Sequence, residues 1–348
     1  MKTYQVVTQG QPLEQRSYDT PEPTGHEILV KTVCCGVCHS DVHLQDGYFD
    51  LGAGNKLPLP LAEPLTLGHE IFGEVVAVGR SVKGIKKGQK YVVYPWIGCG
   101  QCHLCTEDDK EQFCMTPANL GIQRSGGFGD HVLVPHERYL FDAGDTPDYL
   151  AGSYACRGLT AYSALKKVAP FRNDNSLVII SAGGLGLLAL RIARAAYGIN
   201  PIVVDIDDAK LEVAKASGAS AVINSKEANA AAKLAELTEG GAESVVDFVG
   251  AEASFNFGYN LLRRGGSYVL VGLMGGQMTL PLPLLTLQAR KLMGVYVGSL
   301  GEMAELMQLV REGKIEEVPV EIRPISYADQ TLEDLRKGKV LGVVTLQH

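Results

Sequence analysis

The spacing of apolar residues changes about halfway along this chain of 348 residues. Up to about residue 150, short apolar runs alternate with turns rich in Gly and Pro, which is typical of a β-rich, barrel-like unit. The clearest strands are expected at 28–33, 71–78, 90–94 and 131–134. From about residue 176, continuous apolar strands alternate with alanine-rich helical segments. This second pattern predicts a doubly wound unit with a parallel sheet.

The second unit begins with a strand over 177–180, a glycine turn and a helix over 185–197. It should continue with a helix over 209–217 and with strands at 201–204, 244–249 and 267–271. A helix over 301–311 and several strand-like pieces follow, and we expect this tail to return to the first unit. The predicted fold class is therefore α/β with a β-rich partner.

Composition and charge narrow the class of protein. Hydrophobic residues make up 46% of the chain and charged residues 20%, the balance of an ordinary globular protein. A net charge of −7 offers no basic surface to nucleic acid or an anionic membrane. We expect no secretory signal, and the longest uncharged apolar run, 176–190, is shorter than the roughly 20 residues that span a bilayer. The prediction is a cytoplasmic protein whose partners are small molecules.

Four of the eight cysteines lie close together, at Cys99, Cys102, Cys105 and Cys114. A disulfide framework is not expected in a long chain without an export signal. Four thiolates at this spacing can enclose one zinc ion and leave no position for a substrate, so the predicted site is structural. A nucleic-acid zinc ribbon uses similar ligands, but the acidic segment 107–109 argues against it.

A second group of metal-ligating residues is dispersed along the chain: Cys38, His69 and Cys156. Two thiolates and one imidazole would leave a fourth tetrahedral position for a substrate oxygen, and this is the ligand set known for alcohol dehydrogenase. Zinc held there would polarise an alcohol and favour loss of its proton. Any one of the three would more often be structural, but the combination predicts a catalytic site.

A glycine-rich turn, Ser181-Ala182-Gly183-Gly184-Leu185-Gly186, lies between the first strand and the first helix of the second unit. Glycines here let the backbone approach a pyrophosphate at the helix N-terminus, although serine occupies the first fingerprint position. Asp205 ends the next strand, where a carboxylate accepts hydrogen bonds from a ribose and repels a 2′-phosphate. This predicts NAD rather than NADP. Two alternatives stay open: Asp205 as a simple helix cap, and Lys210 as a surface lysine rather than a ribose contact.

Together these motifs resemble the zinc-containing medium-chain alcohol dehydrogenases over essentially the whole chain. The segment Gly68-His69-Glu70-x2-Gly73-x5-Gly79-x2-Val82 matches the zinc signature of that family at every fixed position. The resemblance implies a GroES-like catalytic domain, residues 1–154 and 299–348, interrupted by a Rossmann NAD-binding domain, residues 155–298. It further implies NAD and two zinc ions per chain, and a homo-oligomer with a tetramer favoured over a dimer.

The resemblance also implies roles for residues around the catalytic zinc. Asp41 would orient the ring of a ligand histidine, and Glu70 would lie close behind the metal. Ser40 would take the alcohol proton and pass it through a ribose hydroxyl to His43 at the surface. His39 would lie near the pyrophosphate.

Three departures from the family pattern stand out. Eight residues rather than the usual seven separate Cys105 from Cys114, so this segment should bulge. Val343 stands where many members have an arginine that binds the pyrophosphate. Arg157 follows Cys156 where a small residue is usual. It could pair with an acidic residue between the domains, contact the pyrophosphate, or bind a substrate carboxylate.

The sequence indicates the substrate less clearly than the reaction class, and it leaves alternative functions open. Several segments most resemble dehydrogenases of ω-hydroxy acids such as 6-hydroxyhexanoate: 47–52, 94–99, 162–167 and 272–276. Tyr48, Trp96 and Leu120 are candidates for an apolar substrate pocket, or else for plain packing. A polyol or aryl-alcohol dehydrogenase of the same family is an alternative, as is a zinc-containing NAD-binding protein without catalysis. The zinc-free quinone reductases lack these cysteines.

Overall fold

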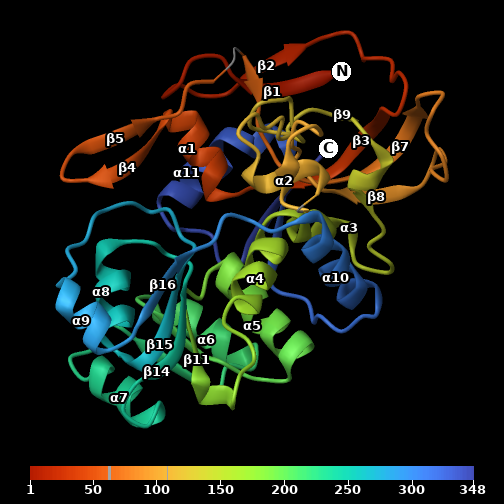
Figure 1. Cartoon of the computed structure of the whole chain (residues 1–348). Coiled ribbons are helices and arrows are strands. Elements are labelled where there is room, and N and C mark those ends of the chain that lie inside the picture. The colour runs from red at the N-terminus through yellow and green to blue at the C-terminus, as the bar shows by residue number, and fades with distance from the viewer. Residues whose placement is uncertain (62–63, 108) are drawn as a thin grey trace.

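The computed structural model describes residues 1–61, 64–107 and 109–348. Figure 1 shows a strand-rich lobe, which holds both chain termini, above an α/β lobe built on parallel strands. Among the described residues, no helix is long and apolar enough to cross a membrane. The cytoplasmic location stays a prediction. Asp108, part of the acidic segment at 107–109, lies outside the described residues.

The strand-rich lobe is organised around one sheet with the order β10-β8-β7-β3-β18-β17, and β9 also pairs with β3. These strands are β3 (Ile28–Gly36), β7 (Glu70–Val78), β8 (Lys90–Val93), β9 (His131–Val134), β10 (Leu140–Phe141), β17 (Val320–Pro324) and β18 (Val343–Gln347). A second sheet joins β1 (Lys2–Val6), β2 (Glu14–Ser17) and β6 (Leu65–Thr66), while β4 (Tyr48–Gly52) and β5 (Asn55–Pro58) form a hairpin. The four strands expected in this half are therefore present.

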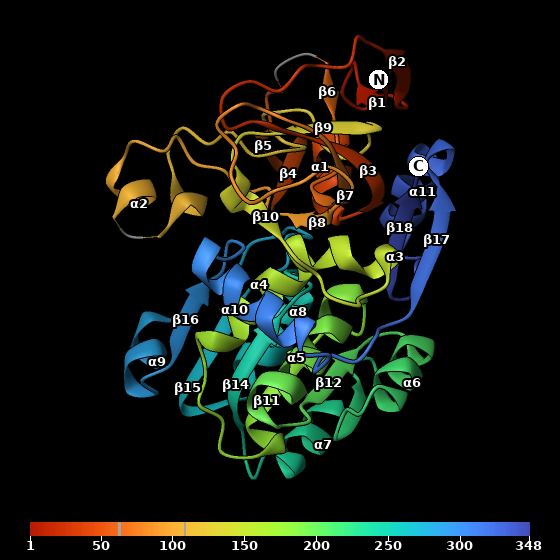
Figure 2. The same ribbon diagram turned by 90° about the vertical axis from the view of Figure 1, so that its right-hand side faces the viewer.

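The C-terminal tail returns to the strand-rich lobe, as the pattern predicted. β18 pairs antiparallel with β3, placing Thr345 opposite Gly36 and Gln347 opposite Cys34. β17 runs parallel to β18, and helix α11 (Ala328–Arg336) lies beside them. Figure 2 shows these three elements together on one side of the lobe.

The α/β lobe contains a six-stranded parallel sheet with the order β13-β12-β11-β14-β15-β16. Its strands are β11 (Leu177–Ile180), β12 (Ile202–Asp205), β13 (Ala221–Asn224), β14 (Ala242–Asp247), β15 (Leu262–Leu270) and β16 (Lys291–Gly294). The two edge strands, β13 and β16, were not predicted. Both are four residues long and carry polar or small residues at their ends, so neither gives a continuous apolar run.

Helices cover both faces of this sheet because its inner strands are apolar on both sides. Val178 and Val204 pack with α7 and α8 in one core cluster, whereas Ile179 and Val203 pack with α4 and α5 in the other. Such a two-faced sheet is the doubly wound arrangement that the sequence predicted. The helices are α1 (His39–Asp46), α2 (His103–Thr106), α3 (Asp148–Ala151), α4 (Arg157–Lys166), α5 (Gly184–Tyr197), α6 (Asp208–Ala216), α7 (Ala230–Leu237), α8 (Glu252–Asn260), α9 (Leu282–Leu287) and α10 (Leu300–Arg311).

Candidate active site

Cys38 is the N-cap residue of helix α1, two residues after the end of β3. The side chain of Asp41 turns back and accepts a hydrogen bond from the Cys38 backbone N–H at 2.9 Å, as in a capping box. The same carboxylate accepts a hydrogen bond from the Gly68 N–H at 3.2 Å. One fully buried aspartate therefore fixes both the segment that carries Cys38 and the segment that carries His69.

His69 lies in the short connection between β6 and β7, where the chain makes a tight turn at Gly68. Gly68 has φ +90°, and a Cβ there would lie 2.5 Å from the Phe128 ring, so the turn requires glycine. His69 is fully buried, and its Nδ1 faces Asp41 Oδ1 at 3.3 Å. Its Nε2 is buried without a hydrogen-bond partner in the structure. Asp41 thus lies where the sequence placed it, and the free nitrogen is the one that a metal would take.

Cys156 occupies the turn between the 3₁₀ segment Gly152–Ala155 and helix α4. The structure brings its sulfur together with the donor atoms of Cys38, His69 and Glu70, all within 4.8 Å of one another. A hydrogen bond from the Cys156 thiol holds the pKa of Cys38 well below its usual range, and the nearby His69 ring adds to this effect. The same hydrogen bond, together with burial, raises the pKa of Cys156 well above its own. A metal ligand must be a thiolate, so a divalent cation bound here would favour ionisation of both sulfurs.

Glu70, the first residue of β7, is fully buried and is paired with Arg157. Glu70 Oε2 lies 3.2 Å from Arg157 Nη1, and Glu70 Oε1 accepts the Arg157 backbone N–H at 3.3 Å. Burial raises the pKa of Glu70 to about 7, an effect that the positive charge of Arg157 opposes. Of the three interpretations of Arg157 given by the sequence, this contact supports pairing with an acidic residue.

Ser40 and His43, the predicted proton path, lie on helix α1. Cys38 Sγ donates a hydrogen bond to Ser40 Oγ at 3.8 Å, so this hydroxyl adjoins the predicted metal ligands. His43 is less accessible than expected: its Nε2 is buried without a hydrogen-bond partner, and its ring lies 4.8 Å from that of Phe49 on β4. The hairpin that follows α1 covers the ring, which the sequence did not indicate. Burial lowers the pKa of His43 and so favours its neutral, proton-accepting form.

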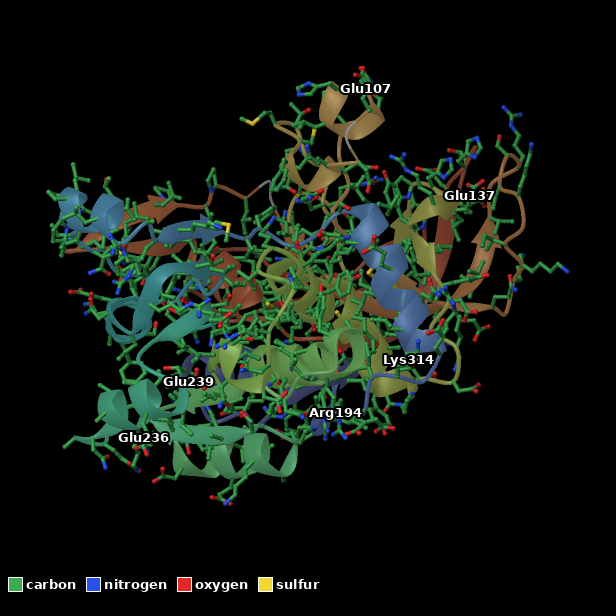
Figure 3. The ribbon with its side chains drawn as sticks, turned by 60° about the horizontal axis from the view of Figure 1, so that its bottom comes forward. Glu107, Glu137, Arg194, Glu236, Glu239 and Lys314 are labelled. Carbon is green, nitrogen blue, oxygen red and sulfur yellow. The ribbon has the colours of Figure 1, made fainter. Side chains whose placement is uncertain are left out.

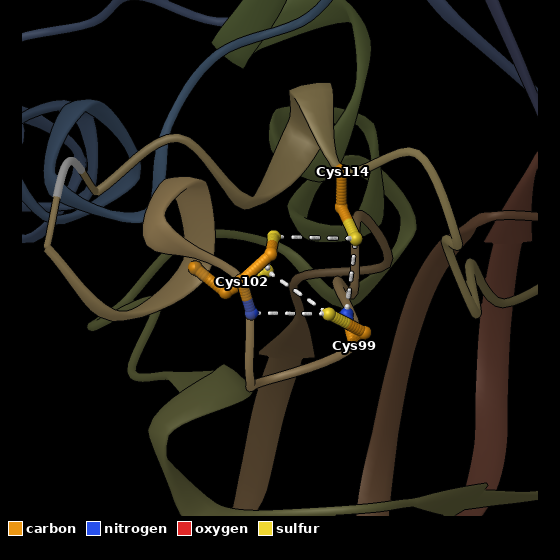
Figure 4. Close-up of side chains that lie close together, drawn as sticks. Cys99, Cys102 and Cys114 are labelled. Carbon is orange, nitrogen blue, oxygen red and sulfur yellow. Dashed lines mark hydrogen bonds between the residues drawn. The ribbon is translucent and has the colours of Figure 1, made fainter.

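The four clustered cysteines form a second site around α2, with their sulfur atoms within 4.8 Å of one another. Cys102 Sγ lies 3.5 Å from Cys105 Sγ and 3.9 Å from Cys114 Sγ (Figure 4). Backbone N–H groups of Gln101 and Cys102 point at Cys99 Sγ and lower the pKa of Cys99 to about 6. The extra residue between Cys105 and Cys114 therefore does not prevent the sulfurs from converging.

This cysteine lobe, residues 98–114, is attached to the rest of the molecule by two acidic side chains. Glu111 is only 3% exposed; it accepts hydrogen bonds from the Gly98 N–H and the Tyr139 hydroxyl and pairs with Arg138 at 2.7 Å. Asp109 Oδ2 accepts hydrogen bonds from Ser299 Oγ and the Gly301 N–H, both at 2.9 Å, at the start of α10. Figure 3 shows Glu107 at the outer end of the lobe. Neither the contacts of Glu111 nor those of Asp109 were predicted from the sequence.

The glycine-rich turn has the tight geometry that a pyrophosphate loop needs. Ser181 has φ +121°, a backbone conformation that glycine adopts more easily, which explains why the fingerprint has glycine there. A Cβ at Gly186 would lie 2.0 Å from the Ser181 carbonyl oxygen, and one at Gly184 would lie 2.5 Å from that of Gly342. The two glycines let α5 begin directly against β11 and β18. Gly183 is the N-cap of α5, and Leu185 lies in its first turn.

Asp205 lies at the end of β12, beside this turn. Its Oδ2 accepts the Ala182 N–H at 2.7 Å, and its Oδ1 accepts the Ile206 and Asp207 N–H groups. The alternative role of helix cap is wrong for Asp205, because the side chain of Asp207 caps α6. Burial lowers the pKa of His39, and the positive charges of Arg157 and Lys210 lower it further. Val343 is fully buried, with a methyl group against Gly184.

Of the pocket candidates, Trp96 and Leu120 are buried at 2% and 1% exposure. The Trp96 ring lies 5.4 Å from that of His69 and 5.7 Å from that of Tyr296, which follows β16 of the other lobe. Tyr296 is 47% exposed, and desolvation and the nearby Cys156 raise its pKa. Tyr296 was not among the pocket residues predicted from the sequence. Tyr48 is half-buried, with Lys56 Nζ 3.5 Å from its ring centre.

Comparisons with known proteins agree with this geometry. Residues 24–145 match the family described as the alcohol dehydrogenase GroES-like domain, and residues 184–312 match the zinc-binding dehydrogenase family. NAD-dependent alcohol dehydrogenases from Sulfurisphaera tokodaii and Sulfolobus acidocaldarius are 34% and 36% identical to this chain, each over 98% of both proteins. The chain belongs to the zinc-binding alcohol dehydrogenase family.

Solved structures of the family have the same overall fold. The alcohol dehydrogenase from Aeropyrum pernix is 29% identical with a TM-score of 0.89, and the match covers 100% of both chains. Acetophenone reductase from Geotrichum candidum, solved with NAD, is 28% identical with a TM-score of 0.85, covering 100% of this chain and 97% of that one. The predicted family, fold class and reaction class, an NAD-linked alcohol dehydrogenase, are confirmed. The ω-hydroxy acid branch, the number of zinc ions, the oligomer and the roles of individual residues stay predictions.

Proposed function

We propose that this protein transfers a hydride between an alcohol and NAD, giving an aldehyde or ketone, at a zinc ion held by Cys38, His69 and Cys156. The observation that carries the proposal is the convergence of those three side chains, distant in sequence, around one buried point. The donor set fits zinc: two converging cysteine sulfurs and a buried imidazole whose Nε2 lacks a hydrogen-bond partner. When bound, zinc supplies a Lewis acid that lowers the pKa of an alcohol hydroxyl.

A second zinc ion is proposed for Cys99, Cys102, Cys105 and Cys114. Four sulfurs within 4.8 Å and backbone N–H groups directed at Cys99 Sγ suit a closed thiolate site. Because all four positions are filled by protein, this ion would serve the fold and not the reaction.

The residues of α1 are proposed to remove the alcohol proton. Ser40 Oγ adjoins Cys38 and would accept the proton, while the unpartnered His43 Nε2, one helical turn later, would take it onward. We therefore expect Ser40→Ala to lower kcat for alcohol oxidation by about a hundredfold, the usual size of a lost acid–base group. Ser40→Thr, which keeps the hydroxyl, should restore most of the rate.

His43→Gln should cost less than Ser40→Ala and should alter the pH profile. Since the pKa of His43 is lowered, its ring accepts protons at neutral pH and loses that capacity only below its ordinary value of 6.5. Initial rates measured from pH 5 to 9 should therefore change shape at the acid end in His43→Gln alone. Small and equal effects of both substitutions, with unchanged profiles, would place the proton path elsewhere.

Asp205 is proposed to set the preference for NAD by repelling a 2′-phosphate. Asp205→Asn should raise kcat/KM for NADP relative to NAD by at least about tenfold. Tenfold is 1.4 kcal/mol, well within the roughly 4 kcal/mol for two unit charges 4 Å apart at an effective dielectric constant of 20. Asp207→Asn, two residues along and engaged only as the cap of α6, is the matched control and should leave the preference unchanged. An unmodified enzyme that already prefers NADP would contradict this role.

The domain division into 1–154 with 299–348 and 155–298 is likewise a proposal. Its support is that the parallel sheet uses strands between Leu177 and Gly294, while β17 and β18 join the sheet of β3.

A homo-oligomer, with a tetramer favoured, is supported by the edge of the parallel sheet. β16 pairs only with β15 among the described strands, and it carries Leu292, which is 38% exposed. The segment before it exposes Leu282 (75%) and Leu287 (63%). An apolar, open strand edge of this kind invites pairing with a second copy. Light scattering that gives a monomer at micromolar concentration would contradict the oligomer.

For the substrate, we propose a medium-chain alcohol, with ω-hydroxy acids as the first class to test. The support is the resemblance of four sequence segments. Arg157, the residue considered for a distal carboxylate, is already paired with Glu70, so it lends that class no support.

A further inference from the structure

Arg157 connects the three chain segments that carry the proposed zinc ligands. It directly follows Cys156. Its Nη2 donates a hydrogen bond to the carbonyl of Val37, the residue before Cys38. Its backbone N–H and Nη1 contact the carboxylate of Glu70, the residue after His69. Arg157 is itself only 7% exposed, so these contacts occupy a buried guanidinium that has no free access to water.

Glu70 is a potential fourth ligand of the same metal. A carboxylate oxygen of Glu70 belongs to the group of donor atoms within 4.8 Å that Cys38, His69 and Cys156 form. Carboxylate oxygens bind zinc in proteins as sulfur and imidazole nitrogen do. If Glu70 joined the other three, the coordination shell would be closed, as in a structural site, and an alcohol would have no position to bind.

The carboxylate is held in a recess on the side of Gly36 and Arg157. A Cβ on Gly36 would lie 2.0 Å from Glu70 Oε2, so the carboxylate occupies space that only a glycine leaves free. Glu70 Oε1 is engaged by the Arg157 N–H, and Oε2 faces the guanidinium. An arginine stays charged at any relevant pH, so it attracts the carboxylate whenever Glu70 is ionised.

We propose that Arg157 is a positioning residue that holds Glu70 away from the catalytic zinc and so keeps the fourth coordination position open. This inference rests on the proposed zinc function of Cys38, His69 and Cys156. Val37, whose carbonyl accepts from Arg157, donates its N–H to the carbonyl of Val344 on β18. Arg157 is therefore also linked, through Val37, to the C-terminal strand of the catalytic lobe.

The test uses the cobalt(II)-substituted protein and imidazole as a neutral ligand for an open metal position. The visible absorption of cobalt(II) depends on its ligands, and the four-cysteine site, being closed, should not respond to imidazole. In the unmodified protein, imidazole should produce a saturable change in the spectrum. In Arg157→Met, Glu70 should occupy the open position, and the apparent affinity for imidazole should fall at least about tenfold, the lower end for loss of a residue that supports metal ligands.

The double variant Arg157→Met/Glu70→Gln separates this role from simple structural support. The amide is a poorer ligand than the carboxylate, so the double variant should regain imidazole binding to within about threefold of the unmodified protein, together with part of its kcat. Should Arg157→Met fail to fold, the same pair of measurements is made with Arg157→Gln, which keeps a polar side chain but removes the positive charge that attracts Glu70. A spectrum and imidazole affinity unchanged by loss of the arginine, or a double variant no better than the single one, overturns the inference. An unmodified protein that takes up no metal at Cys38 instead overturns the proposed function.

Discussion

Replacing Cys38 by serine is expected to reduce alcohol oxidation by at least about a thousandfold while leaving the fold in place. A Lewis acid at a reacting oxygen contributes several kcal/mol, and each 1.4 kcal/mol is a factor of ten in rate. Cys38 is one of three proposed ligands, and a serine hydroxyl cannot supply the thiolate that binds zinc. Initial rates of NADH formation, together with zinc content, check the prediction: the variant should hold one zinc ion per chain instead of two.

Cys34→Ala is the matched control for Cys38→Ser. Cys34 is a buried cysteine on β3 that belongs to neither group of converging donor atoms among the described residues. Its replacement should leave zinc content at two and change the rate by less than about threefold. A Cys38→Ser enzyme that keeps both zinc ions and its turnover would remove Cys38 from the catalytic site.

Cys102→Ser is expected to act on stability and not on the reaction. The binding energy of a closed zinc site contributes to folding, and Cys102 Sγ lies within 3.9 Å of two other proposed ligands. We expect Tm to fall by at least about 5 °C, since a loss of 1 kcal/mol lowers Tm by roughly 2–4 °C in chains of 150–250 residues. Below that temperature, turnover should stay within about threefold of the unmodified enzyme. Differential scanning calorimetry and rates at 20 °C measure the two effects.

The two cysteine variants are also controls for each other. Each removes one thiolate, so any effect of losing a cysteine as such is common to both. If Cys102→Ser abolished turnover at a temperature where the protein is folded, the lobe would contribute to catalysis through its contacts with α10 and Tyr139. If it left Tm unchanged, the four cysteines would not hold a structural ion.

The elements that the sequence predicted are those whose signal is local. Strands such as β11 are continuous apolar runs, and the helix from Gly184 to Tyr197 follows a glycine turn and ends at Gly198, which has φ +69°. β13 and β16 were not predicted from the sequence because an edge strand needs no long apolar run. Its hydrogen bonds are completed by the neighbouring strand.

In the candidate site, too, only the features with a local signal in the sequence were predicted. The spacing of Cys99, Cys102, Cys105 and Cys114 is a local signal, and the residues of α1 follow one another in the chain. The contacts that bring distant segments together left no trace in the pattern: Arg157 with Glu70, and Tyr296 with Trp96, join residues more than 80 positions apart. A buried arginine beside a metal ligand can be noticed in the sequence, but its partner is fixed only when β7 and α4 pack together.

The same reason explains why the contact of the His43 ring with Phe49 was not predicted. Helix periodicity places its ring on one side of α1, but the cover over that side comes from Phe49, in a hairpin whose direction depends on the turn at Gly47. In contrast, the resemblance alone pointed to Asp41, and the structure places its carboxylate 3.3 Å from His69 Nδ1 and 2.9 Å from the Cys38 N–H.

The most direct test of the account is the rate of NADH formation from primary, secondary and ω-hydroxy alcohols by the purified protein carrying two zinc ions per chain. The account predicts steady turnover with NAD on at least one of these classes, lost when a chelator removes the zinc held by Cys38, His69 and Cys156 and regained when zinc is returned. A protein that holds both zinc ions and binds NAD, yet forms no NADH from any of these alcohols, would contradict it.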